Sequence, residues 1–160
     1  MKRAYMTLVV LPLLFASAFA QGNSNMKKLL SLPGKVVSEA KLARPAGALK
    51  LTGYRVEEVQ LPNNQTVQLH GQQTVVDKAW RVTVHGGPFP VRAMPAVIWI
   101  DDQIAGIGIE NETLTQITAI TFDSSLIREG GVISISYGED KDARVSVSPR
   151  LQLKREGGEQ

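Results

Sequence analysis

The sequence predicts an all-β protein, an antiparallel β-sandwich, and three observations support this. From Leu51 onward, apolar and polar side chains alternate over many short segments, which is typical of strands with one buried face. Turn residues (Gly, Pro, Asn and Asp) separate these segments at close intervals. No long segment in this region has the helical period of about 3.6 residues. A small β-barrel is the alternative that the same pattern allows.

The first twenty residues form a separate segment with the pattern of a secretory signal peptide. Lys2-Arg3 precede an apolar run at residues 6–15, and Ala18-Phe19-Ala20 supplies the small residues that a signal peptidase requires. The alternative is a membrane anchor or a buried helix, but a bilayer span needs about 20 apolar residues. We therefore expect residues 1–20 to be removed on export. The mature protein would then lie in the periplasm or outside the cell, without a stable membrane anchor.

Composition narrows the classes of function. The chain contains no cysteine, so a disulfide and a thiolate nucleophile are both excluded. It has 18 basic and 15 acidic residues, and removal of Lys2 and Arg3 leaves a net charge near +1. Because so small an excess of positive charge does not favour binding to a polyanion, no nucleic-acid partner is expected.

Residues 21–50 are basic and lack a clear period. The leucines at residues 29–32 predict one helical turn, which Pro33-Gly34 ends. Residues 36–42 are compatible with a short helix or a strand. We expect a flexible arm or linker over 21–50, because Pro and Gly interrupt any long amphipathic face. The alternative is a basic arm that binds an anionic surface or a partner.

The predicted sandwich domain covers residues 51–154, and residues 155–160 are predicted to be a disordered tail. At its start, an extended segment from Tyr54 is expected to form a hairpin with residues 66–70 around a turn at residues 62–65. The alternation of Trp80, Val82 and Val84 with polar residues predicts a strand with one buried face, and the apolar run at residues 96–100 predicts a central strand covered on both faces. Further strands are predicted at residues 104–109, 118–122, 133–137 and 145–153.

Four segments between residues 80 and 138 occur in an order and spacing that resemble a known family. They are VTVHGGPF (Val82–Phe89), AVIWIDDQIA (Ala96–Ala105), LTQITAITF (Leu114–Phe122) and LIREGGVISISY (Leu126–Tyr137). They resemble the IPT/TIG-type immunoglobulin-like domain, although Asp101-Asp102 stands where that family more often has glycine. The resemblance implies an immunoglobulin-like sandwich that serves as an interaction or spacer module. It supplies no catalytic residues, and a fold alone does not establish a function.

No strong pattern for an enzyme or a metal site is present. His70 and His85 are the only histidines, and both are predicted to face solvent, so a metal site would need a third ligand such as Asp101 or Asp102. A Ser-His-Asp triad would have to use one of the same two histidines, and the sequence contains no G-x-S-x-G motif. We therefore expect neither a metal, nor a cofactor, nor an enzyme.

The loop at residues 86–95 is the predicted binding site, because it is long, rich in Gly and Pro, and contains Phe89, Arg92 and Met94. Through this loop or through an edge strand, the domain is expected to bind another protein or a cell-envelope polymer. One alternative is a small secreted hydrolase that acts on glycan or peptide. Another is a subunit of a larger envelope assembly that is stabilised by strand exchange.

Overall fold

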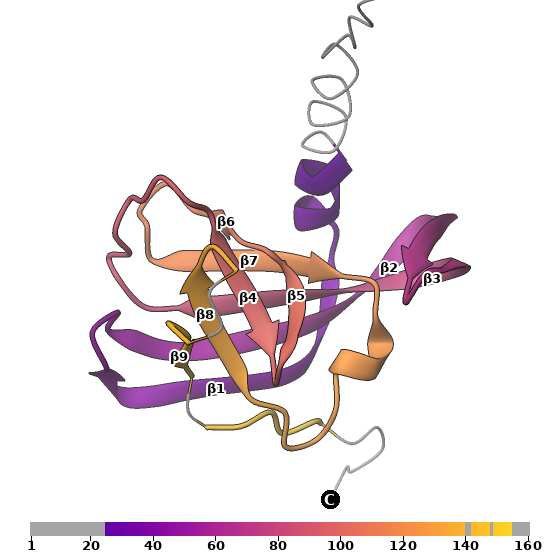
Figure 1. Ribbon diagram of the computed structural model, residues 1–160. Helices are drawn as coiled ribbons and strands as arrows, with labels where there is room; N and C mark the ends of the chain where they lie inside the picture. The colour runs from indigo at the N-terminus through magenta and orange to yellow at the C-terminus, as the bar shows by residue number, and fades with distance from the viewer. Residues whose placement is uncertain (1–24, 140–141, 148, 155–160) are drawn as a thin grey trace, which may run out of the picture.

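The computed structural model describes residues 25–139, 142–147 and 149–154, which form two β-sheets packed face to face (Figure 1). The larger sheet contains β1 (Gly34–Ala46), β2 (Leu51–Leu69), β3 (Gln72–His85), β6 (Ile109–Glu110) and β7 (Gln116–Thr121). The smaller sheet contains β4 (Ala96–Ile100), β5 (Gln103–Ile107), β8 (Ile133–Tyr137) and β9 (Val145–Ser146). A short 3₁₀ turn, η1 (Ser124–Leu126), lies between β7 and β8.

The strands are ordered β1-β2-β3-β7-β6 in the larger sheet and β5-β4-β8-β9 in the smaller one. Each of these pairings is antiparallel. The prediction of an all-β, antiparallel sandwich is therefore confirmed. The predicted signal peptide, residues 1–20, and the predicted tail, residues 155–160, lie outside the described residues.

The main hydrophobic core lies between the two sheets. Val82 and Val84 of β3 are fully buried there, as the alternation in the sequence predicted, and Ile98 and Ile100 of β4 pack against them from the smaller sheet. Each such side chain contributes roughly 1.5–3 kcal/mol when it leaves water. The other buried members are Leu51, Tyr54, Val56, Phe89, Ala96, Ala105, Ile117, Ala119, Leu126, Ile133, Ile135, Val147 and Leu151.

β4 is buried along its whole length, as predicted for a strand covered on both faces. It lies between β5 and β8, so its backbone is paired on both sides. Trp99 points away from the main core. Its indole N–H donates to Ser136 Oγ at 2.8 Å, and the guanidinium of Arg144 stacks over its ring at 5.2 Å from the centroid. Trp80, by contrast, packs against the main core.

The flexible arm expected over residues 21–50 is wrong for residues 34–46, which form β1 and pair with β2 from Gly34↔Val59 to Ala46↔Leu51. Lys and Arg side chains are compatible with this edge position, because they extend from a strand into solvent. At Gly53, which has φ 149°, a Cβ would lie 2.1 Å from the main-chain oxygen of Ala40. Glycine therefore lets the two strands approach.

A short helix, residues 25–31, lies on the outer face of the larger sheet, and the helical turn predicted at its leucines is confirmed (Figure 1). Leu29 is the buried anchor of this helix, with 6% of its surface exposed. It belongs to a second hydrophobic cluster with Leu61, Ala79 and Ile120. In the described part of the chain, no helix is long and apolar enough to cross a membrane.

β2 and β3 continue past the other strands as a two-stranded arm, residues 60–79, at the right of Figure 1. The predicted turn at residues 62–65 is wrong, because β2 runs through it with only an irregular register between Gln60 and Gln65. The chain reverses instead at His70-Gly71, whose φ values of 50° and 79° fit a two-residue type I′ turn. Positive φ values at both positions fit the twist of a hairpin, which a turn around Pro62 would not supply.

Candidate functional site

The three residues predicted to bind a partner, Phe89, Arg92 and Met94, lie in different environments. Phe89 is 2% exposed and belongs to the main core, so its prediction as a surface contact is corrected. Its main-chain N–H donates to the oxygen of Leu114 at 2.7 Å, which fastens the loop over the end of the sandwich. Arg92 and Met94 are exposed, and only these two remain available for contact.

Arg92 lies over the aromatic ring of Tyr137, with its Cζ atom 5.0 Å from the ring centroid. Such stacking orders a guanidinium at the surface while its N–H groups stay able to donate. Burial raises the pKa of Tyr137, the charge of Glu110 raises it further, and Arg92 acts in the opposite direction. The phenol is therefore neutral near pH 7. Among the described residues, its buried hydroxyl has no hydrogen-bond partner.

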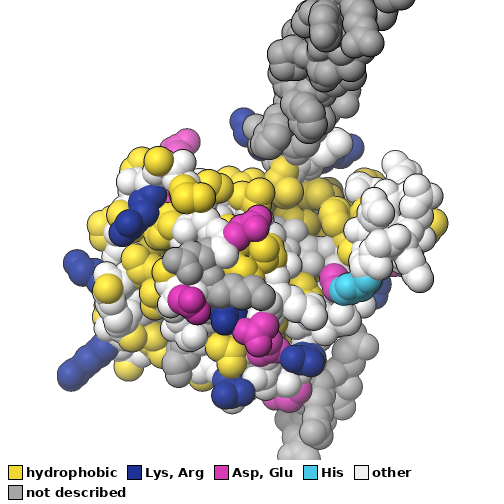
Figure 2. All heavy atoms as spheres, in the orientation of Figure 1, with side chains coloured by type: hydrophobic (Ala, Val, Ile, Leu, Met, Phe, Trp, Pro, Cys, Tyr) yellow, Lys and Arg dark blue, Asp and Glu magenta, His cyan; other side chains and the backbone are white. Residues whose placement is uncertain are grey.

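Four of the five exposed large apolar side chains of the described residues lie on β5 or on the loop before β4. They are Val91 (79% exposed), Met94 (58%), Ile104 (42%) and Ile107 (60%), and we call them the β5 surface. Ile104 lies opposite Trp99, and Ile107 lies opposite Val97. Figure 2 shows apolar side chains along the upper part of the sandwich, around the region where Figure 1 labels β6, whereas the arm is mostly white, the colour of backbone and uncharged polar side chains.

β5 is also an edge of the smaller sheet, because β4 is the only described strand that pairs with it. An unpaired edge presents N–H and C=O groups to an added strand. The other end strands of the two sheets, β1, β6 and β9, are less suited to this. β6 and β9 contain two residues each, and β1 carries Lys35, Lys41 and Pro45 together with two register shifts. No charged residue occurs between Gln103 and Ile109.

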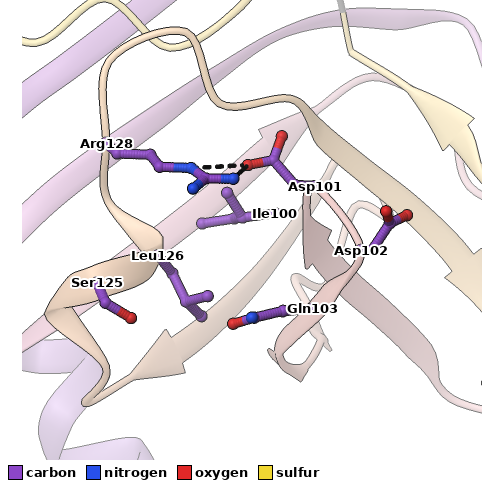
Figure 3. Close-up of a pocket in the computed structure, with 7 residues that line it drawn as sticks. All are labelled: Ile100, Asp101, Asp102, Gln103, Ser125, Leu126 and Arg128. Atoms are coloured by element: carbon purple, nitrogen blue, oxygen red, sulfur yellow. Dashed lines mark hydrogen bonds and ion pairs between the residues drawn. The ribbon is translucent and has the colours of Figure 1, made fainter.

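The turn between β4 and β5 borders a hollow of about 350 Å³, shown in Figure 3. In this view Arg128 and Asp101 reach toward each other above Ile100 and Leu126. Arg128 Nε and Nη2 donate to Asp101 Oδ2 at 3.0 and 2.6 Å, and the N–H of Val132 donates to Oδ1 at 3.0 Å. The bond from Val132 and those from Arg128 hold the pKa of Asp101 below its ordinary value, against the opposing effect of burial.

Arg144 fastens the same turn from the other side. Its Nη1 donates to the main-chain oxygen of Asp101 at 2.6 Å, and its Nη2 donates to Asp102 Oδ1 at 2.8 Å. A second hollow, of about 420 Å³, adjoins this pair. Because each carboxylate bonds to an arginine, this cluster is suited to fixing the turn from which β5 starts. Among the described residues, no three His, Cys, Asp or Glu side chains are grouped closely enough to hold a metal ion.

A third hollow, of about 320 Å³, lies on the outer face of the larger sheet beside the N-terminal helix. Its partly buried ionisable pair is Arg81 and Glu57, each with 12% of the side chain exposed and joined at 2.8 Å. Arg81 Nη1 also donates to the main-chain oxygens of Leu30 and Leu32 at 2.7 and 3.0 Å. The pair therefore ties the helix to the sheet. Burial lowers the pKa of His85, which lines the same hollow, so its imidazole is neutral near pH 7.

The two histidines lie at opposite ends of β3. His85 is the last residue of the strand, and His70 lies in the turn before it. His70 Nε2 is 2.7 Å from Asp123 Oδ2, which connects the tip of the arm to the segment after β7. Because the length of β3 separates the two imidazoles, they do not converge on one site.

The sequence did not single out Ile104 and Ile107 as surface residues. An apolar residue in a predicted strand is usually assigned to the core, and here an irregular register between Ile98 and Trp99 contributes to their outward position. The signal that was available is the absence of charge across β5, because edge strands commonly carry lysine.

No protein-family model matches the chain, and no curated protein and no solved structure does so either. These comparisons therefore neither support nor contradict the resemblance of residues 80–138 to the IPT/TIG-type domain.

Proposed function

We propose that this protein is an exported, non-catalytic interaction module that binds another protein through the β5 surface. The observation on which this depends is that β5, an edge strand without charged residues, carries two of the five exposed large apolar side chains of the described residues, and the loop before β4 carries two more. Exposed apolar groups that are clustered rather than scattered indicate contact sites. The proposal needs no cofactor, and it assigns the protein to the periplasm or the exterior of the cell.

The strand order supports an immunoglobulin-like topology within the sandwich class. Constant-type immunoglobulin domains have strands A-B-E-D in one sheet and C-F-G in the other. Here β2-β3-β7-β6 follows the first order and β4-β8-β9 follows the second, with β5 added beside β4 and β1 added beside β2. The segment that resembles the IPT/TIG-type domain, residues 80–138, spans β3 to β8 within this order.

The kind of partner follows from the chemistry of the edge. An extended peptide segment would pair its backbone with β5 and place apolar side chains on Ile104 and Ile107, as in other cases of strand addition. Arg92, held on Tyr137 beside exposed Met94, adds a guanidinium of the type enriched in protein interfaces. A protein fits this surface better than a cell-envelope glycan, because a glycan offers hydroxyl groups rather than a strand and apolar side chains.

The alternative of a secreted hydrolase is less well supported. A catalytic acid or base would be expected among buried ionisable groups in a hollow. Glu57 and Arg81 are such groups, but they bond to one another and to the N-terminal helix. This arrangement favours a structural role for the pair and leaves the β5 surface as the better candidate for function.

Site-directed photocrosslinking in the exported protein tests the proposal. A photoreactive amino acid at position 107 is expected to give a discrete protein adduct, and one at position 66 is the matched control, because Thr66 is exposed but lies on the β2 strand of the arm. Ile104→Lys in the same protein is expected to lower the yield of the adduct about tenfold, because the partner would have to bury a charge. Circular dichroism would verify that each variant keeps its β structure.

Two results would contradict the proposal. One is an equal yield of the same adducts from positions 66 and 107, which would indicate random collision. The other is an adduct from position 107 whose yield is unchanged by Ile104→Lys. Arg92→Ala is expected to lower the yield of the adduct from position 107 without abolishing it, because the stacked guanidinium is only one part of the proposed contact.

A further inference from the structure

The outer part of the arm is a two-stranded ribbon that pairs with no other described strand. It contacts the rest of the molecule at its tip, where His70 lies 2.7 Å from Asp123, and at its base, where Val76 packs against the cluster around Leu29. The pairing of β1 with β2 ends at Val59, and the pairing of β7 with β3 ends at Trp80. Beyond these points, residues 65–69 and 72–76 pair only with each other. A two-stranded ribbon is marginally stable in water, and a third strand is usually needed to stabilise it.

The hydrogen-bonding pattern of this ribbon follows from its turn. In a two-residue hairpin the closing pair, here Leu69↔Gln72, exchanges both of its backbone hydrogen bonds, and the pairs then alternate. Val67↔Thr74 is therefore bonded within the arm, whereas Gln73 and Val75 direct their N–H and C=O groups to the outer side of β3. These two residues offer the backbone groups that an added strand would use.

This edge lacks the usual protection against pairing. No Lys, Arg, Asp or Glu occurs from Pro62 to Val76, and Val75 is 65% exposed. Edge strands are normally blocked by charged side chains, by proline or by bulges. β1, the outer strand of the same sheet, has all three, with Lys35, Pro45 and two register shifts. The outer strand of the arm has none of these over residues 72–76.

We propose that β3 of the arm pairs with the same segment of a second copy of this chain, antiparallel and centred on Thr74. A two-fold axis through Thr74 sets Gln73 of one copy opposite Val75 of the other, so the outward backbone groups of both copies meet in register. Four backbone hydrogen bonds would form, and the two arms would become one four-stranded sheet. Because the contact is small, the dimer is expected to be weak and dependent on concentration.

A second copy is the occupant that the chemistry of the arm favours. A two-fold contact brings each side chain near its own copy, so any charge in the segment would repel itself, and residues 72–76 contain none. The axis places Thr74 beside the other Thr74, a favourable cross-strand pair. This chain already has such a pair within one sheet, with Thr83 Oγ1 and Thr118 Oγ1 at 3.0 Å. In Figure 1 the arm projects to one side of the sandwich.

The first test is the oligomeric state of the processed full chain by sedimentation over a wide range of concentration. The wild type is expected to show a reversible dimer. Val75→Lys is expected to raise the dissociation constant about tenfold or more, because the two lysines would be diagonal neighbours across the axis, each opposite Gln73 of the other copy. Thr66→Lys is the matched control. Thr66 lies on β2 opposite Val75, on the same face of the arm but away from the proposed contact. The Thr66→Lys variant is therefore expected to dimerise like the wild type.

The second test identifies the contact by amide hydrogen exchange. Raising the concentration of wild type is expected to slow exchange at Gln73 and Val75 and to leave Thr74 unchanged, because only the first two amides point outward. A chain that stays monomeric at the highest concentration would overturn the proposal, as would a dimer that Val75→Lys does not weaken. Concentration-dependent protection at Thr66 and Gln68 instead would move the contact to β2 and would also overturn it. Neither result bears on the crosslinking of the β5 surface.

Discussion

At the scale of single residues, Asp101 has the clearest structural task. Its φ of 54° lies in the left-handed region, which Asp and Asn tolerate better than most residues. Its carboxylate accepts hydrogen bonds from Arg128 and from the N–H of Val132, so one side chain connects the turn before β5 to the segment before β8. The position of the β5 surface therefore depends on this turn.

The pH dependence of stability is expected to reflect Asp101. Because hydrogen bonds from Val132 and Arg128 lower its pKa in the folded state, it stabilises the fold above its ordinary pKa near 4, and this contribution is lost as the pH falls through the lower, folded value. Asp101→Asn keeps the tolerance for positive φ but removes the charge. In urea unfolding at neutral pH, the free energy of unfolding of this variant is expected to be lower than that of the wild type by less than about 1 kcal/mol, since Arg128 is exposed to solvent. The deficit should shrink below about pH 4; a deficit independent of pH would contradict this assignment.

At the scale of elements, the N-terminal helix depends on one arginine. The helix has a single buried anchor, Leu29, and is too short to be stable by itself. Arg81 bonds to the main-chain oxygens of Leu30 and Leu32, which a helix end would otherwise leave to solvent, and Glu57 holds the guanidinium in place. Packing and capping together therefore keep the helix on the outer face of the larger sheet.

Arg81→Met is expected to release this helix, because methionine fills a similar volume without donating hydrogen bonds. Amide exchange across residues 25–32 should become faster, and the free energy of unfolding should fall by about 1–3 kcal/mol, because the hydrogen bonds that Arg81 donates to Glu57, Leu30 and Leu32 are lost. Arg55→Met is the control, since Arg55 lies 3.7 Å from the same carboxylate but is 44% exposed. Equal exchange rates at residues 25–32 in the two variants would show that Arg81 is not the tether.

At the scale of the whole molecule, the last described segment closes the sandwich. Leu151 exchanges backbone hydrogen bonds with Gly130 and Gly131 beside the smaller sheet, and the N–H of Lys154 donates to Val37 of β1 in the larger sheet at 2.8 Å. The hydroxyl of Tyr54, deep in the core, donates to the main-chain oxygen of Arg150 at 2.9 Å. The C-terminal segment therefore bonds to both layers.

Leu151→Ala is expected to lower the free energy of unfolding by about 2–5 kcal/mol, because Leu151 is 1% exposed and its removal leaves a cavity in the main core. Leu153→Ala is the matched control in the same segment, where the side chain is only partly buried. Leu153→Ala should lower the free energy of unfolding by a clearly smaller amount in the same denaturant titration. Similar losses for the two variants would mean that the segment does not close the core.

Side-chain alternation predicted the strand character of β3 and β8 and the faces of these strands that enter the core, because a period of two depends only on neighbouring residues. The apolar run at residues 96–100 predicted that β4 is buried on both faces. Alternation did not predict that Ser134 and Ser136, on the other face of β8, are buried as well. It failed for β1, for the turn of the arm, and for Phe89. Each of these depends on a partner distant in sequence: β1 on the edge of β2, the arm on the register between β2 and β3, and Phe89 on the space between two sheets. The unpaired edges of β5 and of the arm also depend on residues distant in sequence, because the tertiary structure determines which strands lie beside one another.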